Sequence, residues 1–414
     1  MHERTAVSGV DSIYGERAAD AHDTNNPGFF WKSGWAFVLG YGVSAMIQAF
    51  VPKGRLTQYM GETNAKSLSL STLFGTISSS CSFAALATAR SLFLKGANFV
   101  ATVAFMFAST NLVIELGILI YIFLGWQFLI AEVIGGLLLI IISSIIIRLT
   151  YPQKWIHEAR KKVEEEAGNM EQDFDWKERI KSRDGWLLVG NKFVMEWKMA
   201  WEDILIGFTV AGFIAVLVPQ AFWKALFLNG LQGQIPAFFI HLENALVAPF
   251  VAVATFIGSM GNIPLATVLN ANGVLFAGIM GFNYSDLMVP PLVNMNRKYY
   301  GNKVAFYIAL VMYGSIVLTA LLLNYGFDLF HLIPESGKEI ASLTAFKVDY
   351  TFWFNMVFIA VAAILTYLNV RFKKTQSMTI GHHHHHSEGL SMKRSIVYLF
   401  AGMVVIGLFL NILV

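Results

Sequence analysis

The stretch Ser78-Ser79-Ser80-Cys81-Ser82 interrupts an otherwise apolar run between residues 68 and 92. Five consecutive small polar or thiol residues cannot all face lipid at low cost, because the hydrocarbon core of a bilayer offers no partners for their polar atoms. Packing of small residues between two helices is one interpretation of such a cluster. A helix break that lines a cavity fits better, so we expect a broken or re-entrant helical hairpin here.

A weaker copy of this pattern returns near residue 260. In the matched segments, Leu86-Ala87-Thr88 corresponds to Leu265-Ala266-Thr267, Gly96 to Gly273, and residues 107–112 to residues 282–287. This alignment places Asp286 opposite Asn111 and Met260 opposite Cys81. Two related hairpins with polar atoms at membrane depth predict a transporter built from internal repeats.

Composition alone places the chain in a membrane. Hydrophobic residues make up 56% of it and charged residues 14%, and the mean hydropathy is +0.56, which a soluble core of this size would not need. We predict an all-α polytopic membrane protein with about ten hydrophobic segments, some of them broken or re-entrant. The segments are residues 30–51, 68–92, 98–122, 126–148, 203–228, 245–270, 273–293, 304–326, 352–370 and 395–414.

The longest polar interval, residues 150–200, alternates basic and acidic groups and predicts a solvated, partly helical loop. It holds more Lys and Arg than any other connection, so the positive-inside rule places it and the N-terminus in the cytoplasm of a multi-pass protein of the inner (plasma) membrane. If every segment crossed, the basic stretch 371–394 would fall outside, so one segment does not cross or the rule is locally broken. No cleavable signal peptide is evident near the start of the chain.

The expected organisation follows from these patterns. It consists of a polar tail (1–28), a first transmembrane repeat (29–149), a charged cytoplasmic loop (150–200), a second transmembrane repeat (201–326) and two additional segments (327–414) with a His-rich loop at 381–389.

Polar side chains inside the predicted spans are the candidate substrate-binding residues, because polar groups at membrane depth are costly unless they face a cavity, a cation or a partner. Asn111 and Glu115 are spaced i, i+4 and would share one helical face. The alternative for Glu115 and Asp286 is a place near the lipid headgroups, and Glu132 is a weak candidate without a visible partner. The candidate substrate-binding residues are Ser79, Ser80, Cys81, Ser82, Ser109, Thr110, Asn111, Glu115, Ser259, Met260, Asn262, Asn283, Ser285 and Asp286.

Soft ligands suggest a metal as the substrate. Cys81 and Met260 would supply sulfur, and His382, His383, His384, His385 and His386 form a tract that can capture zinc, copper or nickel loosely. The tract has two other interpretations, an inserted purification tag or a variable loop without a role in transport.

The order of these motifs resembles a known family. The Ser-rich Cys81 element, Leu86-Ala87-Thr88, Lys95-Gly96-Ala97 and Ala108-Ser109-Thr110-Asn111, with a degenerate second copy, is similar to the predicted permeases that include organoarsenical and copper/zinc efflux permeases. The resemblance covers most of residues 30–326. Members carry a Cys-x-Cys or similar element, whereas this chain has a single thiol, which argues against the arsenical branch.

The resemblance and the residues together predict a secondary efflux permease for a soft or borderline metal or metalloid species. A permease for a small organic or thiol-bearing solute is the alternative, and an intramembrane enzyme or a structural subunit ranks lower because Cys81 has no histidine near it in the predicted spans. We expect the lipid bilayer and the transported solute as partners, no cofactor and no nucleic acid, and a homo-oligomer is compatible with the sequence.

Overall fold

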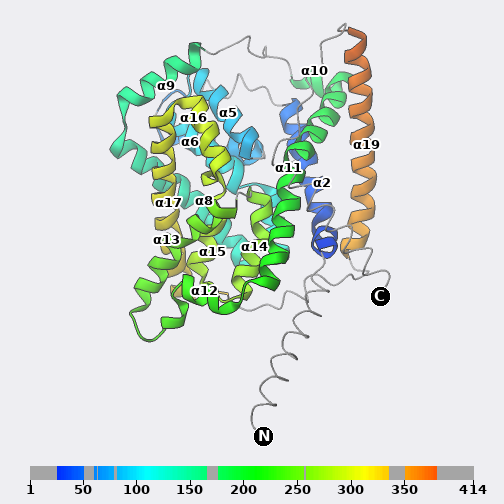
Figure 1. Ribbon diagram of the computed structural model, residues 1–414. Coiled ribbons are helices and arrows are strands. Elements are labelled where there is room, and N and C mark those ends of the chain that lie inside the picture. The colour runs from blue at the N-terminus through cyan, green and yellow to red at the C-terminus, as the bar shows by residue number, and fades with distance from the viewer. Residues whose placement is uncertain are drawn as a thin grey trace.

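The computed structural model describes residues 26–50, 60–62, 64–78, 82–165, 176–255, 258–334 and 350–379, and these residues form helices and no β-strand (Figure 1). Among them, α8 (Trp126–Thr150), α13 (Ala237–Thr255), α17 (Asn302–Leu329) and residues 352–374 of α19 (Tyr350–Thr379) are long and apolar enough to cross a membrane. The pair α6 (Phe99–Asn111) and α7 (Ile114–Phe123), bent by 42°, forms one more span if it is counted as a unit. The chain is therefore an all-α polytopic membrane protein.

The first hairpin enters and leaves the membrane on one side. It consists of α4 (Ala65–Ser78) and α5 (Ser82–Leu94), so the helix breaks at the serine cluster as the sequence predicts. At its base, Asn98 follows α5 but donates hydrogen bonds back to the segment before α4, from its backbone N–H to the Met60 carbonyl (2.8 Å) and from Nδ2 to Met60 (3.1 Å) and Glu62. Because α5 has 13 residues, it reaches about 20 Å, roughly half of the bilayer with its headgroups.

The second hairpin has the same construction. Helices α13 and α14 (Ser259–Ala271) are followed by a turn that bonds to the segment before them and to α13 itself. Asn229 Nδ2, before α13, donates to the Gly273 carbonyl (2.8 Å), and the Leu275 N–H donates to Asn244 Oδ1 of α13 (3.3 Å). The chain therefore returns to the side from which it entered, although α13 by itself is long enough to span.

A constant spacing of 177 residues relates the two hairpins. The first helix ends at 78 and at 255, and the second begins at 82 and at 259. The same N–H to carbonyl bond of 3.0 Å closes each turn, from residue 97 to 92 and from 274 to 269. The turn glycines, Gly96 and Gly273, both have positive φ, 101° and 85°, which favours residues without a Cβ. The base contact between residues 67 and 98 recurs between 244 and 275.

This register confirms the match of Gly96 with Gly273 and corrects the other correspondences. Carried without gaps from the turn, it places Asp286 opposite Ser109, not opposite Asn111, and position 81 opposite Gly258, not opposite Met260. The sequence match aligned the similar tripeptides Leu86-Ala87-Thr88 and Leu265-Ala266-Thr267. The hydrogen bonds of the two turns instead fix the alignment of the helices.

The two hairpins enter from opposite ends of α8. Near the start of α8, the Phe128 ring lies 5.3 Å from that of Phe276, which begins α15 (Phe276–Asn283) just after the second turn. At the far end, the Thr150 hydroxyl lies 2.7 Å from that of Tyr307, whose ring is 6.4 Å from that of Phe99 just after the first turn. Since α8 can cross the membrane, the turns lie on opposite sides and the repeats have inverted topology.

Three helices stand beside the hairpins: α2 (Asn26–Phe50), α11 (Arg183–Leu217) and α19 pack on one another (Figure 1). The predicted loop 150–200 contains α9 (Gln153–Glu165) and α10 (Trp176–Lys181), and its predicted end at residue 200 lies inside α11. The predicted segment 395–414 and the tail up to residue 25 lie outside the described residues.

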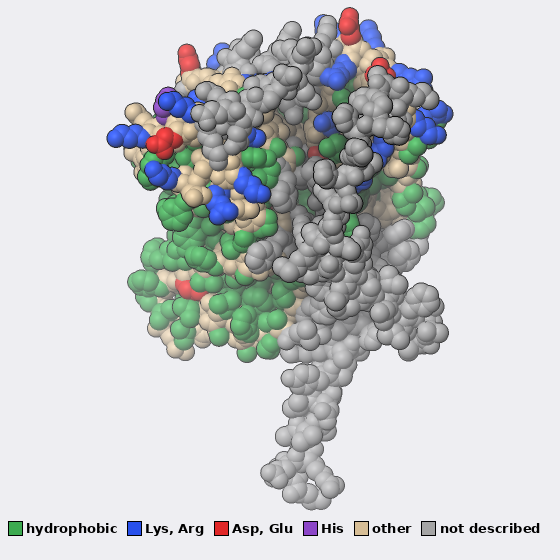
Figure 2. Space-filling model, turned by 45° about the horizontal axis from the view of Figure 1, so that its top comes forward, with side chains coloured by type: hydrophobic (Ala, Val, Ile, Leu, Met, Phe, Trp, Pro, Cys, Tyr) green, Lys and Arg blue, Asp and Glu red, His purple; other side chains and the backbone are tan. Residues whose placement is uncertain are grey.

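Basic side chains gather at the end of the molecule where α9 lies, above a band of hydrophobic side chains (Figure 2). There, α9 is fixed to the base of the first hairpin, because Arg160 donates hydrogen bonds to the carbonyls of Phe93 (2.7 Å) and Ala97 (2.8 Å). Its guanidinium also lies 4.0 Å from the centre of the Phe93 ring, a cation–π contact.

We expect Asn98→Ala to destabilise the first hairpin. The side chain caps α6 by accepting a hydrogen bond from the Ala101 N–H (2.8 Å) and also satisfies the Met60 and Glu62 carbonyls. Loss of a helix cap alone costs about 0.5–2 kcal/mol, and the two carbonyls lose their donor as well. The unfolding temperature of the purified variant measures the effect. Asn272→Ala is the control, since Asn272 Nδ2 bonds the Val268 carbonyl of its own helix; an equal effect of the two substitutions would contradict this role.

Candidate functional site

The two repeats meet at the tip of the first hairpin. The Ser82 hydroxyl, at the start of α5, donates a 3.1 Å hydrogen bond to Asp286 Oδ2 of the second repeat. Both side chains are buried, and Asp286 Oδ1 has no hydrogen-bond partner among the residues that the structure describes. Because Ser82 is separated from the base of its hairpin by the whole length of α5, the contact lies near the middle of the membrane.

Asp286 lies where the second repeat loses its α-helix. Helix α15 ends at Asn283, a single 3₁₀ turn covers Asp286–Met288, and α16 (Pro290–Tyr300) then begins. Pro290 suits the first position of a helix, and Val289 before it is extended, with φ −61° and ψ 142°. A broken helix frees backbone and side-chain polar groups at membrane depth, which occurs where they line a cavity or are buried in protein.

Amide side chains in the second repeat have unused hydrogen-bonding capacity. Asn262 in α14 and Asn283 at the end of α15 are buried, and neither the Oδ1 nor the Nδ2 atom of either has a hydrogen-bond partner among the described residues. The Ser109 hydroxyl, at the position equivalent to Asp286, is also buried and has no partner in this part of the chain. Such groups are rare in proteins and call for an explanation.

The end of α6 contributes Thr110 and Asn111, both buried. Thr110 donates back into its own helix, to the carbonyls of Met106 (3.2 Å) and Phe107 (3.3 Å). Asn111 Nδ2 likewise donates to the Phe107 carbonyl (3.1 Å), but Asn111 Oδ1 has no partner within the described ranges. Asn111 therefore presents an acceptor at the break between α6 and α7.

The prediction that Asn111 and Glu115 share a helical face is wrong. The chain leaves the α-helix between them, and Val113 is extended, with φ −96° and ψ 145°. Glu115 is buried against α2: a Cβ added at Gly40 would lie 2.3 Å from its Cβ. Both Glu115 and Asp286 are buried inside the protein.

Other candidate residues have local roles or lie outside the described residues. Ser285 donates to the Gly281 carbonyl (2.5 Å), and Ser259 and Met260 form the half-buried start of α14. Among the described residues, no three His, Cys, Asp or Glu side chains are grouped so that they could hold a metal ion. The candidates outside the described residues are Ser79, Ser80, Cys81 and the histidine tract His382–His386.

Glu132 of α8 is a stronger candidate than the sequence indicates. Its side chain is 1% exposed, and neither carboxyl oxygen has a hydrogen-bond partner among the described residues. Tyr284 holds this part of α15 against α8, donating from its hydroxyl to the Ala131 carbonyl (2.9 Å). The only signal in the sequence was a single carboxylate in a long apolar run, and its neighbour Asp286 belongs to the other repeat.

Comparison with known proteins identifies the family. Residues 27–325, which contain both hairpins and the Ser82–Asp286 contact, match the model of a family described as "Predicted permease". The chain belongs to this permease family. The permease is also 36% identical over 326 residues to the protein named "Putative permease Rv2963" from Mycobacterium tuberculosis (strain ATCC 25618 / H37Rv), a match that covers 76% of this chain and 79% of the relative. No solved structure gives a significant match to the permease.

Proposed function

We propose that this permease is a secondary transporter that exports a soft or borderline metal or metalloid species and binds it where the two repeats meet. The observation that carries the proposal is the Ser82–Asp286 hydrogen bond, which joins the tip of a re-entrant hairpin in one repeat to the broken helix of the other. Secondary transporters with inverted repeats bind substrates and coupling ions at such breaks near the bilayer midplane.

The geometry suggests how access could alternate. Each hairpin reaches the site from one side of the membrane, so movement of one hairpin opens a path to that side while the other hairpin keeps its side closed. Asp286 provides a carboxylate that could exchange a proton for a cation. The Cys81 thiol, a potential soft ligand, directly precedes Ser82 in the sequence. In this proposal the site moves a solute and catalyses no reaction, requires no cofactor, binds no nucleic acid and works in the plasma membrane.

A small polar organic solute is the second candidate substrate. The unpartnered amides of Asn262 and Asn283 can each both donate and accept hydrogen bonds, a combination that suits a polar organic molecule better than a metal ion.

Transport assays with a panel of metal and metalloid salts separate the candidates. We expect cells that produce the protein to tolerate at least one soft or borderline ion better than cells without it, and Cys81→Ser to remove this protection because serine lacks the soft sulfur ligand. Uptake into inside-out membrane vesicles measures the same flux directly. If no ion on the panel is protective or transported, while a small organic solute is, the metal proposal is wrong.

We expect removal of the histidine tract to have a small effect. A run of five adjacent imidazoles imposes no fixed coordination geometry, so it can collect ions without selecting among them. Deletion of His382–His386 should lower transport by no more than about twofold, less than 0.5 kcal/mol in activation free energy. Complete loss of transport at a normal expression level would show that the tract belongs to the transport path.

A further inference from the structure

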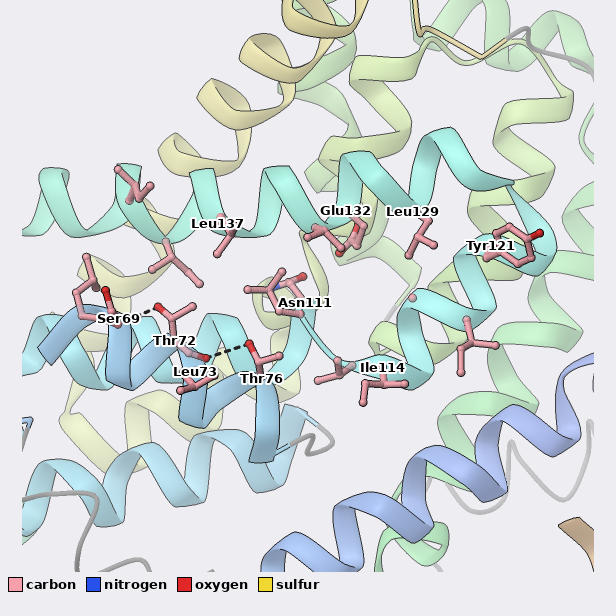
Figure 3. Close-up of a pocket in the computed structure, with 18 of the residues that line it drawn as sticks. Ser69, Thr72, Leu73, Thr76, Asn111, Ile114, Tyr121, Leu129, Glu132 and Leu137 are labelled. Carbon is pink, nitrogen blue, oxygen red and sulfur yellow. Dashed lines mark hydrogen bonds between the residues drawn. The ribbon is translucent and has the colours of Figure 1, made fainter. Parts of the chain in front are cut away.

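A groove opens on the first repeat between α4, the α6–α7 break and α8 (Figure 3). Its volume of about 1090 Å³ is at the upper end of the range of small-molecule sites, roughly 300–1,000 Å³. Most of its lining is apolar, and the rim includes Leu73, Ile114, Val133 and Leu137, whose side chains are 44–54% exposed. Since α8 is a membrane span, this rim faces the bilayer, and the groove is reached from lipid.

Most polar groups of the groove present hydrogen-bond acceptors; the exception is the indole N–H of Trp35, a buried donor without a partner among the described residues. On α4, Thr72 and Thr76 donate their hydroxyl protons to the carbonyls of Leu68 (2.9 Å) and Thr72 (3.0 Å), so their lone pairs remain available. Asn111 uses its Nδ2 within α6 and has a free Oδ1, and both oxygens of Glu132 are free. Glu132 is 1% exposed and Asn111 is 2% exposed, and both line the groove (Figure 3).

These features define the chemistry of a ligand. A carboxylate and a set of acceptors are satisfied by a positive group with N–H bonds, because charge-assisted hydrogen bonds to carboxylates are the stronger ones. The apolar walls, with the Tyr121 ring at their far end, suit a hydrocarbon or aromatic body. The position of the rim requires that the ligand partition into the bilayer.

We propose that the groove is a binding site for an amphiphilic ammonium ion that enters from the bilayer, with its N–H groups on Glu132 and Asn111 and its apolar body between α4 and α8. The ammonium site uses Asn111 and Glu132, which are also candidates for the transport site, but it does not depend on the transported solute being a metal. Tyr284, two residues before Asp286, donates a hydrogen bond to the Glu132 carbonyl (3.3 Å), so a cation bound at Glu132 also changes the electrostatic field near the contact between the repeats.

The test uses three dansyl probes and the full-length protein in phosphatidylcholine nanodiscs. Monodansylcadaverine carries a primary ammonium group, its N-acetyl derivative is neutral, and its trimethylammonium derivative is charged but has no N–H at the cationic centre. We expect saturable binding of the primary ammonium with a Kd at least about tenfold below that of the acetyl probe, which corresponds to about 1.4 kcal/mol, and intermediate binding of the trimethyl probe. Empty nanodiscs measure simple partitioning.

Two variants locate the site. Glu132→Gln should bring the three Kd values together, and Leu137→Trp should block binding of all three probes by filling the groove. Glu243→Gln, which removes a carboxylate from α13, is the matched control and should bind as the wild type does. Signals equal to those of empty nanodiscs would overturn the proposal, as would equal Kd values for the amine and acetyl probes or wild-type binding by Leu137→Trp. The comparison of the amine and acetyl probes and the Leu137→Trp variant test the proposal even if Glu132→Gln fails to fold.

Discussion

Asp286→Asn should lower the transport rate by at least about tenfold, an increase of about 1.4 kcal/mol in the activation free energy. The amide has the same shape and can still accept the hydrogen bond from Ser82, so the contact between the hairpin and the broken helix can persist. What is lost is the carboxyl group, which can carry a negative charge or exchange a proton, whereas an amide can do neither. Transport into vesicles, normalised to the amount of protein, measures the change.

Asp328→Asn is the control for this prediction. Asp328 lies near the end of α17, far along the chain from the contact between the repeats, and the substitution removes the same charge from the protein. We expect it to transport at the wild-type rate, and we expect Asp286→Asn alone to respond less to an imposed pH gradient. Wild-type transport by Asp286→Asn at normal expression, across the tested gradients, would remove Asp286 from the mechanism.

Gly75→Ala should destabilise the protein by about 1–3 kcal/mol, the usual cost of adding atoms to a closely packed contact. Gly75 lies in α4 where this helix crosses α6, and an added Cβ would lie 2.6 Å from both the Ala108 Cβ and the Phe105 carbonyl oxygen. The carbonyl belongs to a helix and cannot rotate away, so α4 must move outward. Thermal unfolding of the purified protein in detergent measures the loss.

Gly314→Ala is a matched control in a second helix. No atom lies within 4 Å of a Cβ added there, so alanine adds no clash and improves helix propensity by up to about 1 kcal/mol. The two substitutions should therefore change the unfolding temperature in opposite directions. A neutral result for Gly75→Ala would mean that α4 and α6 are farther apart than the structure shows.

The local breaks of the fold could be predicted from the sequence, but their alignment could not. The serine cluster predicted a helix break, because consecutive polar residues are poorly tolerated in a lipid-facing helix, and α4 ends at Ser78 and α5 begins at Ser82. Gly96 and Gly273 predicted equivalent turns, which their positive φ values confirm. The register of the helices depends on hydrogen bonds around those turns, and no residue type reports them.

The residues of the candidate site could likewise be predicted only in part. Asp286 and Asn111 were identified because polar residues inside apolar runs are costly, and this argument needs no partner. Glu132 remained a weak candidate because its neighbours Tyr284 and Asp286 belong to the other repeat, and the sequence does not show that they lie close to it. Glu115 was grouped with Asn111 because no Pro or Gly marks the break at Leu112–Val113, so the sequence suggests a continuous helix where the chain bends by 42°.

Single-cysteine labelling tests the inverted hairpins most directly. In a Cys81→Ser background, a membrane-impermeant maleimide can be applied to right-side-out and inside-out vesicles that contain Glu62→Cys, Lys95→Cys, Gln232→Cys or Asn272→Cys. Residues 62 and 95 lie at the base of the first hairpin, and residues 232 and 272 at the base of the second. The first pair should react only from the side that carries α9, and the second pair only from the opposite side. Reaction of all four from one side, or of residues 62 and 95 from different sides, would contradict the inverted re-entrant hairpins on which the proposed transport site depends.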